Sequence, residues 1–393
     1  MEKNISKKIF INISCFYGAM IFGMALVMTS PILIEISQRI DRSIENMGSI
    51  FSLFYGGFII GSFLSSSIIN YWGRKKTLSF FYFLFFISVL GMAFIFNYPF
   101  LIVVFSLIGL SGGFIESQVS SIVLEVNKKN EGLFVNLTQV FLGIGAFIGP
   151  LIPTFIISKG IDWKYSYIIL SLICLINFIY FLFINIPDTR LKKIRGSIKT
   201  FKPVTLDKGA VFFLLVFAIF FYVSAEMGLV IWFPTFLRLN KLFSSILASQ
   251  VLSFFWLSFV AGRLLIGLLT KKVKILNILL VVTILSIPSV LLGIYIENKF
   301  LIIFAFILTG LLFSGIWPLI VSLGGLRYPS KRDFVVSILV MAGGVGGLFS
   351  PWLIGKVFSS LNLLFALNII YIFLFFLIAL IISLVIIDRK SLT

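Results

Sequence analysis

Long apolar runs alternate with short charged or turn-forming segments along nearly the whole chain. Most runs approach or exceed the roughly 20 residues that an α-helix needs to cross the hydrocarbon core of a bilayer. The runs are continuous and lack the period-two alternation of transmembrane strands, so they predict helices. We predict twelve spans, at about 9–34, 46–70, 77–96, 99–124, 132–158, 165–187, 208–237, 243–270, 275–296, 300–326, 333–359 and 363–387.

The composition places these helices in lipid. Of 393 residues, 60% are hydrophobic and 12% are charged, whereas a soluble domain is about half apolar and about a quarter charged. The first run, from Ile9 to Ile34, is too long for a signal-peptide core and lacks a small-residue cleavage pattern, so we expect a permanent span. We therefore predict an all-α polytopic protein of the cell (cytoplasmic or inner) membrane.

Several kinds of chemistry are excluded by residues that the sequence lacks. There is no His, and Cys15 and Cys174 both lie inside apolar runs, so neither a metal site nor a disulfide framework is suggested. The phosphate-binding pattern G-x-x-x-x-G-K-[ST] is absent, because Gly355-Lys356 is followed by Val357. We expect a transporter driven by a gradient, with no cofactor, rather than an ATP-driven pump or an enzyme.

Positive charge is distributed unevenly between the two sides of the predicted bundle. The formal net charge is +18, and an even number of spans puts both termini on one side. Of the 32 Lys and Arg residues, 23 lie on the side of the termini, 8 lie on the opposite side, and Arg263 lies within a span. The positive-inside rule then predicts cytoplasmic termini. The basic balance is thus an insertion signal, and we expect no nucleic-acid partner.

The two halves of the chain resemble each other at a nearly constant offset of 201 to 205 positions. The matches pair Phe16-Tyr17 and Gly23 with Phe221-Tyr222 and Gly228, and Gly143-Ile144-Gly145-Ala146 and Pro150 with Gly344-Val345-Gly346-Gly347 and Pro351. A basic linker at 188–207 separates six-span halves at 1–187 and 208–393. This is the plan of the major facilitator fold, in which the substrate site lies between the halves near mid-membrane. We expect the Gly-rich segments to allow close helix packing.

Further motifs are spread over nearly the whole chain. They are Gly113-Phe114-Ile115-Glu116-Ser117, Asn136-Leu137-Thr138-Gln139, Tyr222-Val223-Ser224-Ala225-Glu226, Phe254-Phe255-Trp256, Gly262-Arg263-Leu264 and Gly315-Ile316-Trp317-Pro318. This set resembles the fucose–galactose–glucose permease family of sugar/proton symporters within the major facilitator superfamily. It is closest in pattern to bacterial glucose/mannose-type permeases, because residues 26–31 lack the carboxylate that fucose permease carries in its first span. The resemblance implies import of a hexose-like sugar with a proton.

A short basic loop follows the second span. The segment Asn70-Tyr71-Trp72-Gly73-Arg74-Lys75-Lys76 resembles the loop signature of the superfamily, with Asn70 in place of the usual Asp and Ser66 in place of the usual Gly. The resemblance implies that Asn70, Gly73 and Arg74 take part in gating.

Two carboxyl groups lie deep inside predicted spans. Of 14 acidic residues, only Glu116 and Glu226 do so. A charge at mid-membrane costs on the order of 3 kcal/mol, so such residues usually face a cavity and have a function. A buried carboxyl that can gain and lose a proton is what proton coupling requires. The alternative is a protonated Glu that bonds a neighbouring helix.

Amide and aromatic side chains complete the candidate substrate site. Asn136 and Gln139 share one helix face with Gly143, and their amides suit sugar hydroxyls, although amides also bond helices together. Trp256 and Trp317 lie deep enough to stack on a sugar ring, and Tyr222 lies one turn before Glu226. Trp232 fits an interfacial aromatic belt, as Trp residues of membrane helices often do.

Arg263 leaves two interpretations open. It stands seven residues before the end of its span, where its side chain could extend to the interface, or it could serve as a gating or coupling cation.

The sequence favours a secondary importer of a hexose-like sugar, driven by protons and acting as a monomer. The alternatives are a proton-coupled exporter of drugs or small metabolites, and a sensor that binds a ligand without moving it. No appended signalling domain is visible, which counts against the sensor. A membrane enzyme is disfavoured, because two carboxylates without His or a metal cluster make a poor active site.

Overall fold

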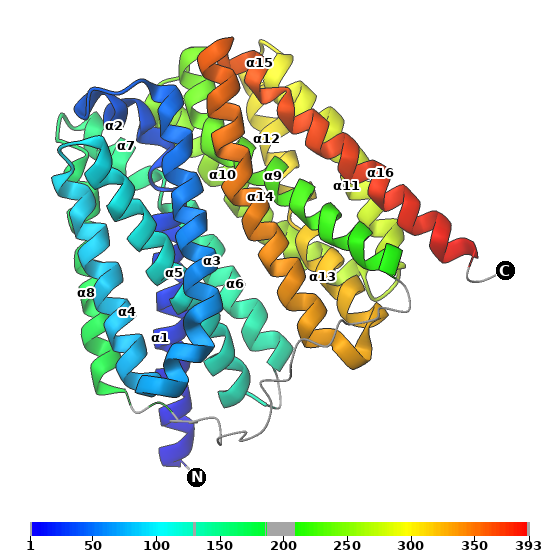
Figure 1. Cartoon of the computed structure of the whole chain (residues 1–393). Coiled ribbons are helices and arrows are strands. Elements are labelled where there is room, and N and C mark those ends of the chain that lie inside the picture. Colours follow the sequence, from blue (N-terminus) through cyan, green and yellow to red (C-terminus); the bar gives the residue numbers. More distant parts are fainter. Residues whose placement is uncertain (1, 129–130, 185, 187–208, 391–393) are drawn as a thin grey trace.

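The protein is a bundle of membrane-spanning helices (Figure 1). The computed structural model describes residues 2–128, 131–184, 186 and 209–390, so the predicted linker at 188–207 lies outside the described residues. Within the described part, twelve helical segments are long and apolar enough to cross a membrane. They begin and end within a few residues of the predicted runs, except where the second and sixth end earlier and the first extends to Arg39. The predicted all-α fold with twelve spans is confirmed.

The helices have the following bounds. In the first half they are α1 (Glu2–Val27), η1 (Ser30–Ile32), α2 (Leu33–Arg39), η2 (Ile44–Met47), α3 (Gly48–Trp72), α4 (Arg74–Gly91), η3 (Met92–Phe94), α5 (Tyr98–Val126), α6 (Glu131–Ile148), α7 (Leu151–Ser158) and α8 (Lys164–Phe183). In the second half they are α9 (Gly209–Leu239), α10 (Ser245–Leu269), α11 (Ile275–Tyr295), α12 (Lys299–Phe313), α13 (Ile316–Arg327), η4 (Pro329–Lys331), α14 (Arg332–Ser360), α15 (Leu363–Leu367) and α16 (Ile369–Lys390).

Helix starts follow local capping chemistry, and the caps repeat between the halves. The Asn97 side chain accepts a hydrogen bond from the N–H of Phe100 at the start of α5, and Asn298 accepts from the N–H groups of Phe300 and Leu301 at the start of α12. The two caps are 201 residues apart. Equivalent spans of the two halves therefore begin with the same kind of N-cap, an asparagine side chain.

The tenth span is broken between α12 and α13. Pro318 has no N–H to give to the carbonyl of Ser314, one turn earlier. At the break, the Ser314 hydroxyl donates to the carbonyl of Leu311 at 2.7 Å, and the Tyr222 hydroxyl of α9 donates to the carbonyl of Phe313 at 2.8 Å. Side chains thus satisfy backbone groups that the interrupted helix frees in a non-aqueous environment.

Glycines allow the two halves to meet closely along two equivalent seams. A methyl group on Gly143 of α6 would overlap Val260 of α10, and one on Gly344 of α14 would lie 2.7 Å from Ile59 of α3. Both Gly143 and Gly344, and both Ile59 and Val260, are 201 residues apart. The predicted close packing at the glycine-rich segments is confirmed, and equivalent residues of the two halves make the two contacts.

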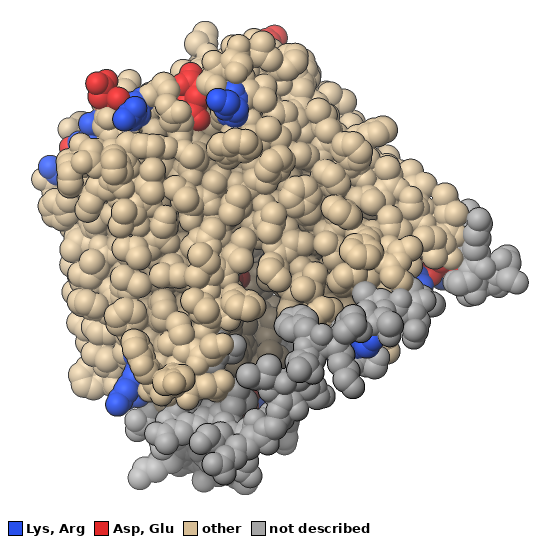
Figure 2. Space-filling model, in the orientation of Figure 1, with Lys and Arg blue, Asp and Glu red and all other residues tan. Residues whose placement is uncertain are grey.

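The halves are joined at the end of the bundle opposite to the termini (Figure 1). There, Arg238 of α9 donates to both carboxyl oxygens of Glu35 on α2, each at 2.8 Å, and to the carbonyl of Pro31 at 2.9 Å. The hydroxyls of Thr154 and Ser249, one from each half, are 2.7 Å apart and buried. In Figure 2, a recess opens between the halves nearer the termini, and the flanks between the charged ends are nearly free of charge. The molecule is therefore closed at one end and hollowed toward the other.

Candidate functional site

A polar cluster lies between the halves, with Glu116 and Glu226 near the middle of their spans and Gln139 and Arg263 nearer the side of the termini. The Arg263 Nη1 of α10 donates a hydrogen bond to Oε1 of Gln139 on α6 at 2.9 Å, which links the two halves. The guanidinium carbon also lies 4.8 Å from the centre of the Phe259 ring. Arg263 therefore points into the protein and does not extend to the interface. A role as a gating or coupling cation stays a prediction.

Both buried carboxyl groups face this arginine. Gln139 also lies beside the Glu116 carboxyl of α5, and since its oxygen accepts from Arg263, its NH2 group is the one available to Glu116. Arg263 interacts electrostatically with Glu116 and with Glu226 of α9. Glu226 is only 6% exposed. The structure thus brings together four residues that the sequence selected: Glu116, Gln139, Glu226 and Arg263.

The charges of this cluster do not balance when every group is ionised. One guanidinium faces two carboxyl groups, and Arg stays protonated in proteins. A single proton on either Glu116 or Glu226 would leave one cation with one anion, which is the arrangement a non-aqueous site tolerates. The cluster can therefore take up and release one proton. Uptake leaves one carboxylate paired with Arg263, and release leaves a second carboxylate without a cation.

Two tyrosine hydroxyls adjoin the carboxyl groups. Tyr222 is fully buried, lies beside Glu226, and donates to the Phe313 carbonyl as described above. Tyr55 of α3 faces both carboxyl groups, and its hydroxyl donates to the sulfur of Met227 in the other half at 2.6 Å. Sequence reasoning missed Tyr55. The available signal was the one tyrosine of this span, directly before Gly56-Gly57.

Two buried N–H groups of the cluster have no hydrogen-bond partner among the described residues. They are Nε of Arg263 and Nε1 of Trp256, which is 3% exposed. The two residues lie on one face of α10, and the Phe259 ring lies between them, 5.1 Å from Trp256. Unpaired buried donors are costly, so this face is suited to a ligand that carries hydrogen-bond acceptors.

Other predicted site residues lie at the edge of the cluster or outside it. Asn136 is exposed, one turn from Gln139 toward the side of the termini. Trp317 is half-buried on α13, with its Nε1 beside Gly343 of α14. Trp232 is fully buried and donates to the Pro351 carbonyl at 3.1 Å. The expectation of an interfacial position for Trp232 is wrong, because a partner on α14 satisfies its N–H away from water.

The loop between α3 and α4 forms a separate polar contact. Gly73 has a φ of 83°, which a residue with a side chain rarely adopts, and it allows the chain to turn directly from α3 into α4. Arg74 Nη1 then donates to Glu125 of α5 at 2.5 Å, within the same half. Asn70 is exposed at the end of α3. A gating role for Asn70, Gly73 and Arg74 stays a prediction.

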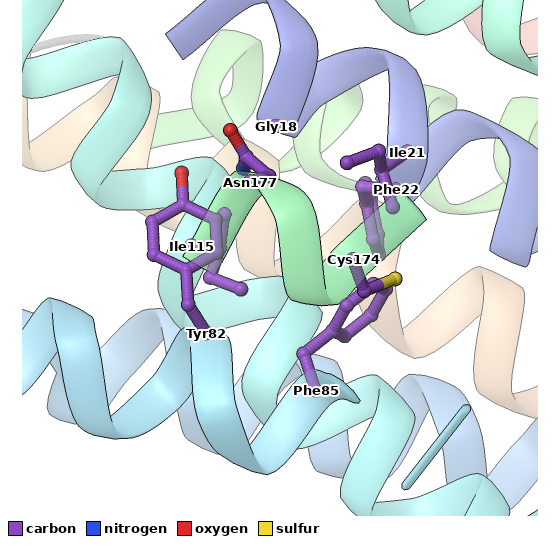
Figure 3. Close-up of a pocket in the computed structure, with 8 residues that line it drawn as sticks. All are labelled: Gly18, Ile21, Phe22, Tyr82, Phe85, Ile115, Cys174 and Asn177. Atoms are coloured by element: carbon purple, nitrogen blue, oxygen red, sulfur yellow. The ribbon is translucent and has the colours of Figure 1, made fainter. Parts of the chain in front are cut away.

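A small interior cavity of the first half is distinct from the charged cluster (Figure 3). It is lined by Gly18, Ile21, Phe22, Tyr82, Phe85, Ile115, Cys174 and Asn177. A methyl group on Gly18 would lie 2.6 Å from the Tyr82 hydroxyl, so glycine makes room for polar groups of α4 and α8. The cavity is of the size of one water molecule, about 10 Å³. It is too small to hold a solute.

The fold and the central cluster define a class of protein: a carrier with two helical halves around a polar site. Comparison with known proteins identifies the family. The profile of the Major Facilitator Superfamily matches residues 15–351. The chain belongs to this superfamily and is a secondary transporter, and the prediction that it is not an enzyme is confirmed.

Curated relatives and solved structures agree with this assignment. The chain is 24% identical over 362 residues to a TsgA homologue of Buchnera aphidicola subsp. Acyrthosiphon pisum (strain Tuc7), covering 90% of this chain and 91% of the relative. A TsgA homologue of Yersinia pestis (strain Pestoides F) is 21% identical over 340 residues, covering 86% and 85%.

Solved structures share the fold at low identity. A mutant of the nucleoside transporter NupG matches with a TM-score of 0.76 and 15% identity, covering 96% of this chain and 98% of that one. A D-xylose–proton symporter matches with a TM-score of 0.76 and 16% identity, covering 95% and 96%. A bacterial homologue of the human lysosomal transporter Spinster, in an inward-facing and occupied conformation, matches with a TM-score of 0.72 and 13% identity, covering 95% and 96%.

Proposed function

We propose that the protein imports a hexose-like sugar together with a proton, by alternating access of the site between its halves. The observation that carries this proposal is the cluster of Glu116, Gln139, Glu226 and Arg263, in which one cation faces two carboxyl groups. Uptake of one proton balances the cluster, and its release leaves an unpaired carboxylate. The likeness of the motifs to sugar/proton permeases of the fucose–galactose–glucose family supports the sugar.

The chemistry of the site supports a polar, ring-shaped substrate. Arg263 Nε and Trp256 Nε1 lack partners among the described residues, and sugar hydroxyls can accept from both. The Trp256 and Phe259 rings supply flat apolar surface next to these donors. A purely apolar solute would leave the donors unsatisfied, which disfavours a general exporter of hydrophobic drugs.

We further propose that the termini are cytoplasmic and that this conformation is inward-facing. The excess of Lys and Arg on the side of the termini supports this orientation. The halves are joined at the opposite end by Glu35–Arg238 and by Thr154–Ser249, so the recess opens toward the termini. In this state a substrate would leave for the cytoplasm.

Uptake into proteoliposomes tests the proposal. The panel is labelled glucose, mannose, galactose, fucose and N-acetylglucosamine, with D-xylose and a nucleoside added because transporters of these solutes share the fold. We expect accumulation of one hexose that depends on an inward proton gradient. In Glu116→Gln, accumulation should be lost while counterflow exchange survives, because the neutral side chain mimics the protonated carboxyl.

A matched control removes a carboxyl outside the cluster. Glu297→Gln changes a side chain that is 86% exposed, is paired with Lys241 and lies between spans, and it should leave accumulation unchanged. If no sugar is taken up with or without a gradient, the sugar proposal is wrong. Efflux driven by an opposite gradient would then favour the exporter.

A further inference from the structure

We propose that Tyr222 is a positioning residue that couples the protonation of Glu226 to the break in the tenth span. The proposal rests on the proton role of Glu226 proposed above. It follows from how one hydroxyl is shared between a side chain of α9 and the backbone at the break between α12 and α13.

The Tyr222 hydroxyl has a single hydrogen. In the structure it is donated to the carbonyl of Phe313, the last residue of α12, at 2.8 Å. The same hydroxyl lies beside the Glu226 carboxyl, one turn further along α9. Because the hydrogen is already used, a bond between the two groups in this arrangement requires Glu226 to be protonated and to donate. The arrangement therefore fits a protonated Glu226.

Loss of the proton reverses the direction of this contact. An ionised carboxyl can only accept hydrogen bonds, and a hydrogen bond to a charged group is roughly twice as strong as a neutral one. The Tyr222 hydroxyl then turns to Glu226, and the Phe313 carbonyl loses its donor in a buried environment. The Ser314 hydroxyl does not replace it, since it donates to the carbonyl of Leu311.

Loss of the donor to the Phe313 carbonyl affects a part of the tenth span that is packed tightly against α10. Gly262 of α10 lies against Ser314, and Gly315 lies against Ile266 of α10. A methyl group at Gly315 would be 2.5 Å from Ile266, so the break has little free space and a change in its bonding must shift α13. Trp317 follows two residues later and reports on such a shift through its contact with Gly343.

Other titratable and charged groups face Glu226 and have to be controlled. They are Arg263 of α10, Glu116 of α5, Tyr55 of α3 and Tyr222 on the same helix. Arg263 keeps its charge throughout. Glu116 is the other carboxyl of the cluster, so a Glu116→Gln background isolates the response of Glu226.

The experiment is a pH titration of Trp317 fluorescence in the purified full chain, without sugar or flux. The signal is the difference between proteins with Trp317 and the same proteins with Trp317→Phe. We expect a pH-dependent change in the wild type and in Glu116→Gln. Glu226→Gln, whose NH2 always donates to Tyr222, should hold the acidic value at every pH.

Tyr222→Phe gives the opposite fixed value. Without a hydroxyl the Phe313 carbonyl is uncapped at every pH, so the signal should stay at the alkaline value. A wild-type pH response that survives in Tyr222→Phe would overturn the proposal, as would a wild type with no response. Since no transport is measured, this outcome is independent of whether the substrate is a sugar, and gradient-driven uptake tests that separately.

Discussion

At the residue scale, the Arg39–Asp162 ion pair joins the last residue of the first span, at the end of α2, to Asp162, which lies between spans just before α8. Partial burial opposes ionisation of Asp162, but the N–H of Lys164 and the guanidinium of Arg39 outweigh it and hold the pKa of Asp162 below its ordinary value. The Arg39 guanidinium also lies 4.6 Å from the centre of the Trp163 ring. The pair thus fixes the corner where the sixth span begins.

A group with a lowered pKa stabilises the fold above its unfolded pKa, about 3.9 for Asp, and loses this contribution as the pH falls through the folded value. The side chain of Asp162 is 31% exposed, so we expect at most about 1 kcal/mol. Asp162→Asn keeps an oxygen for Lys164 but loses the charge. Its thermal unfolding midpoint in detergent should fall less than that of the wild type on acidification. Equal acid sensitivity of the two proteins would contradict this assignment.

At the element scale, the seam between α6 and α10 depends on Gly143 lying against Val260. We expect Gly143→Ala to destabilise the protein by about 1–3 kcal/mol, the usual cost of an extra methyl in a tight contact. The double variant Gly143→Ala/Val260→Ala should recover most of the loss, because the second change makes room for the first.

The control is Gly267→Ala on α10, the helix that carries Val260, where an added methyl meets nothing within 4 Å. Thermal unfolding midpoints of the four proteins check the expectation. If Gly143→Ala behaves like Gly267→Ala, the seam is looser than the structure has it.

The elements were the part of the structure that the sequence predicted best. A run of about twenty apolar residues in lipid must satisfy its own backbone hydrogen bonds, which it does by forming a helix. The span positions therefore follow from hydropathy alone. Glu116, Glu226 and Arg263 were found because charges in spans are rare. By contrast, the burial of Trp232 and the place of Tyr55 depend on how helices far apart in the chain face each other, which no local pattern encodes.

At the scale of the whole molecule, alternating access requires the halves to separate at the end where Thr154 and Ser249 meet. We expect oxidation of T154C/S249C to form a cross-link that stops transport, with activity restored by a reductant. The measurement is sugar uptake or counterflow before and after treatment, in a background lacking Cys15 and Cys174.

A cross-link inside one half should have no such effect. Ser289 and Thr309, both of the second half, have hydroxyls 2.9 Å apart and are as deeply buried. Oxidised S289C/T309C should retain transport, because each half moves as a unit. Full activity of oxidised, cross-linked T154C/S249C would exclude an opening at that end of the bundle.

The offset of 201 residues that relates the two glycine seams also applies to the site. It pairs Glu116 with Trp317 and Tyr55 with Trp256, so a carboxyl in one half corresponds to an indole in the other, and a phenol to an indole. The scaffold is repeated but its lining is not. A ligand that sits on the approximate twofold axis therefore meets different chemistry on each side, and turning it by half a rotation would exchange its partners. The duplicated frame supplies the motion, and the unequal lining selects a single orientation for whatever is carried.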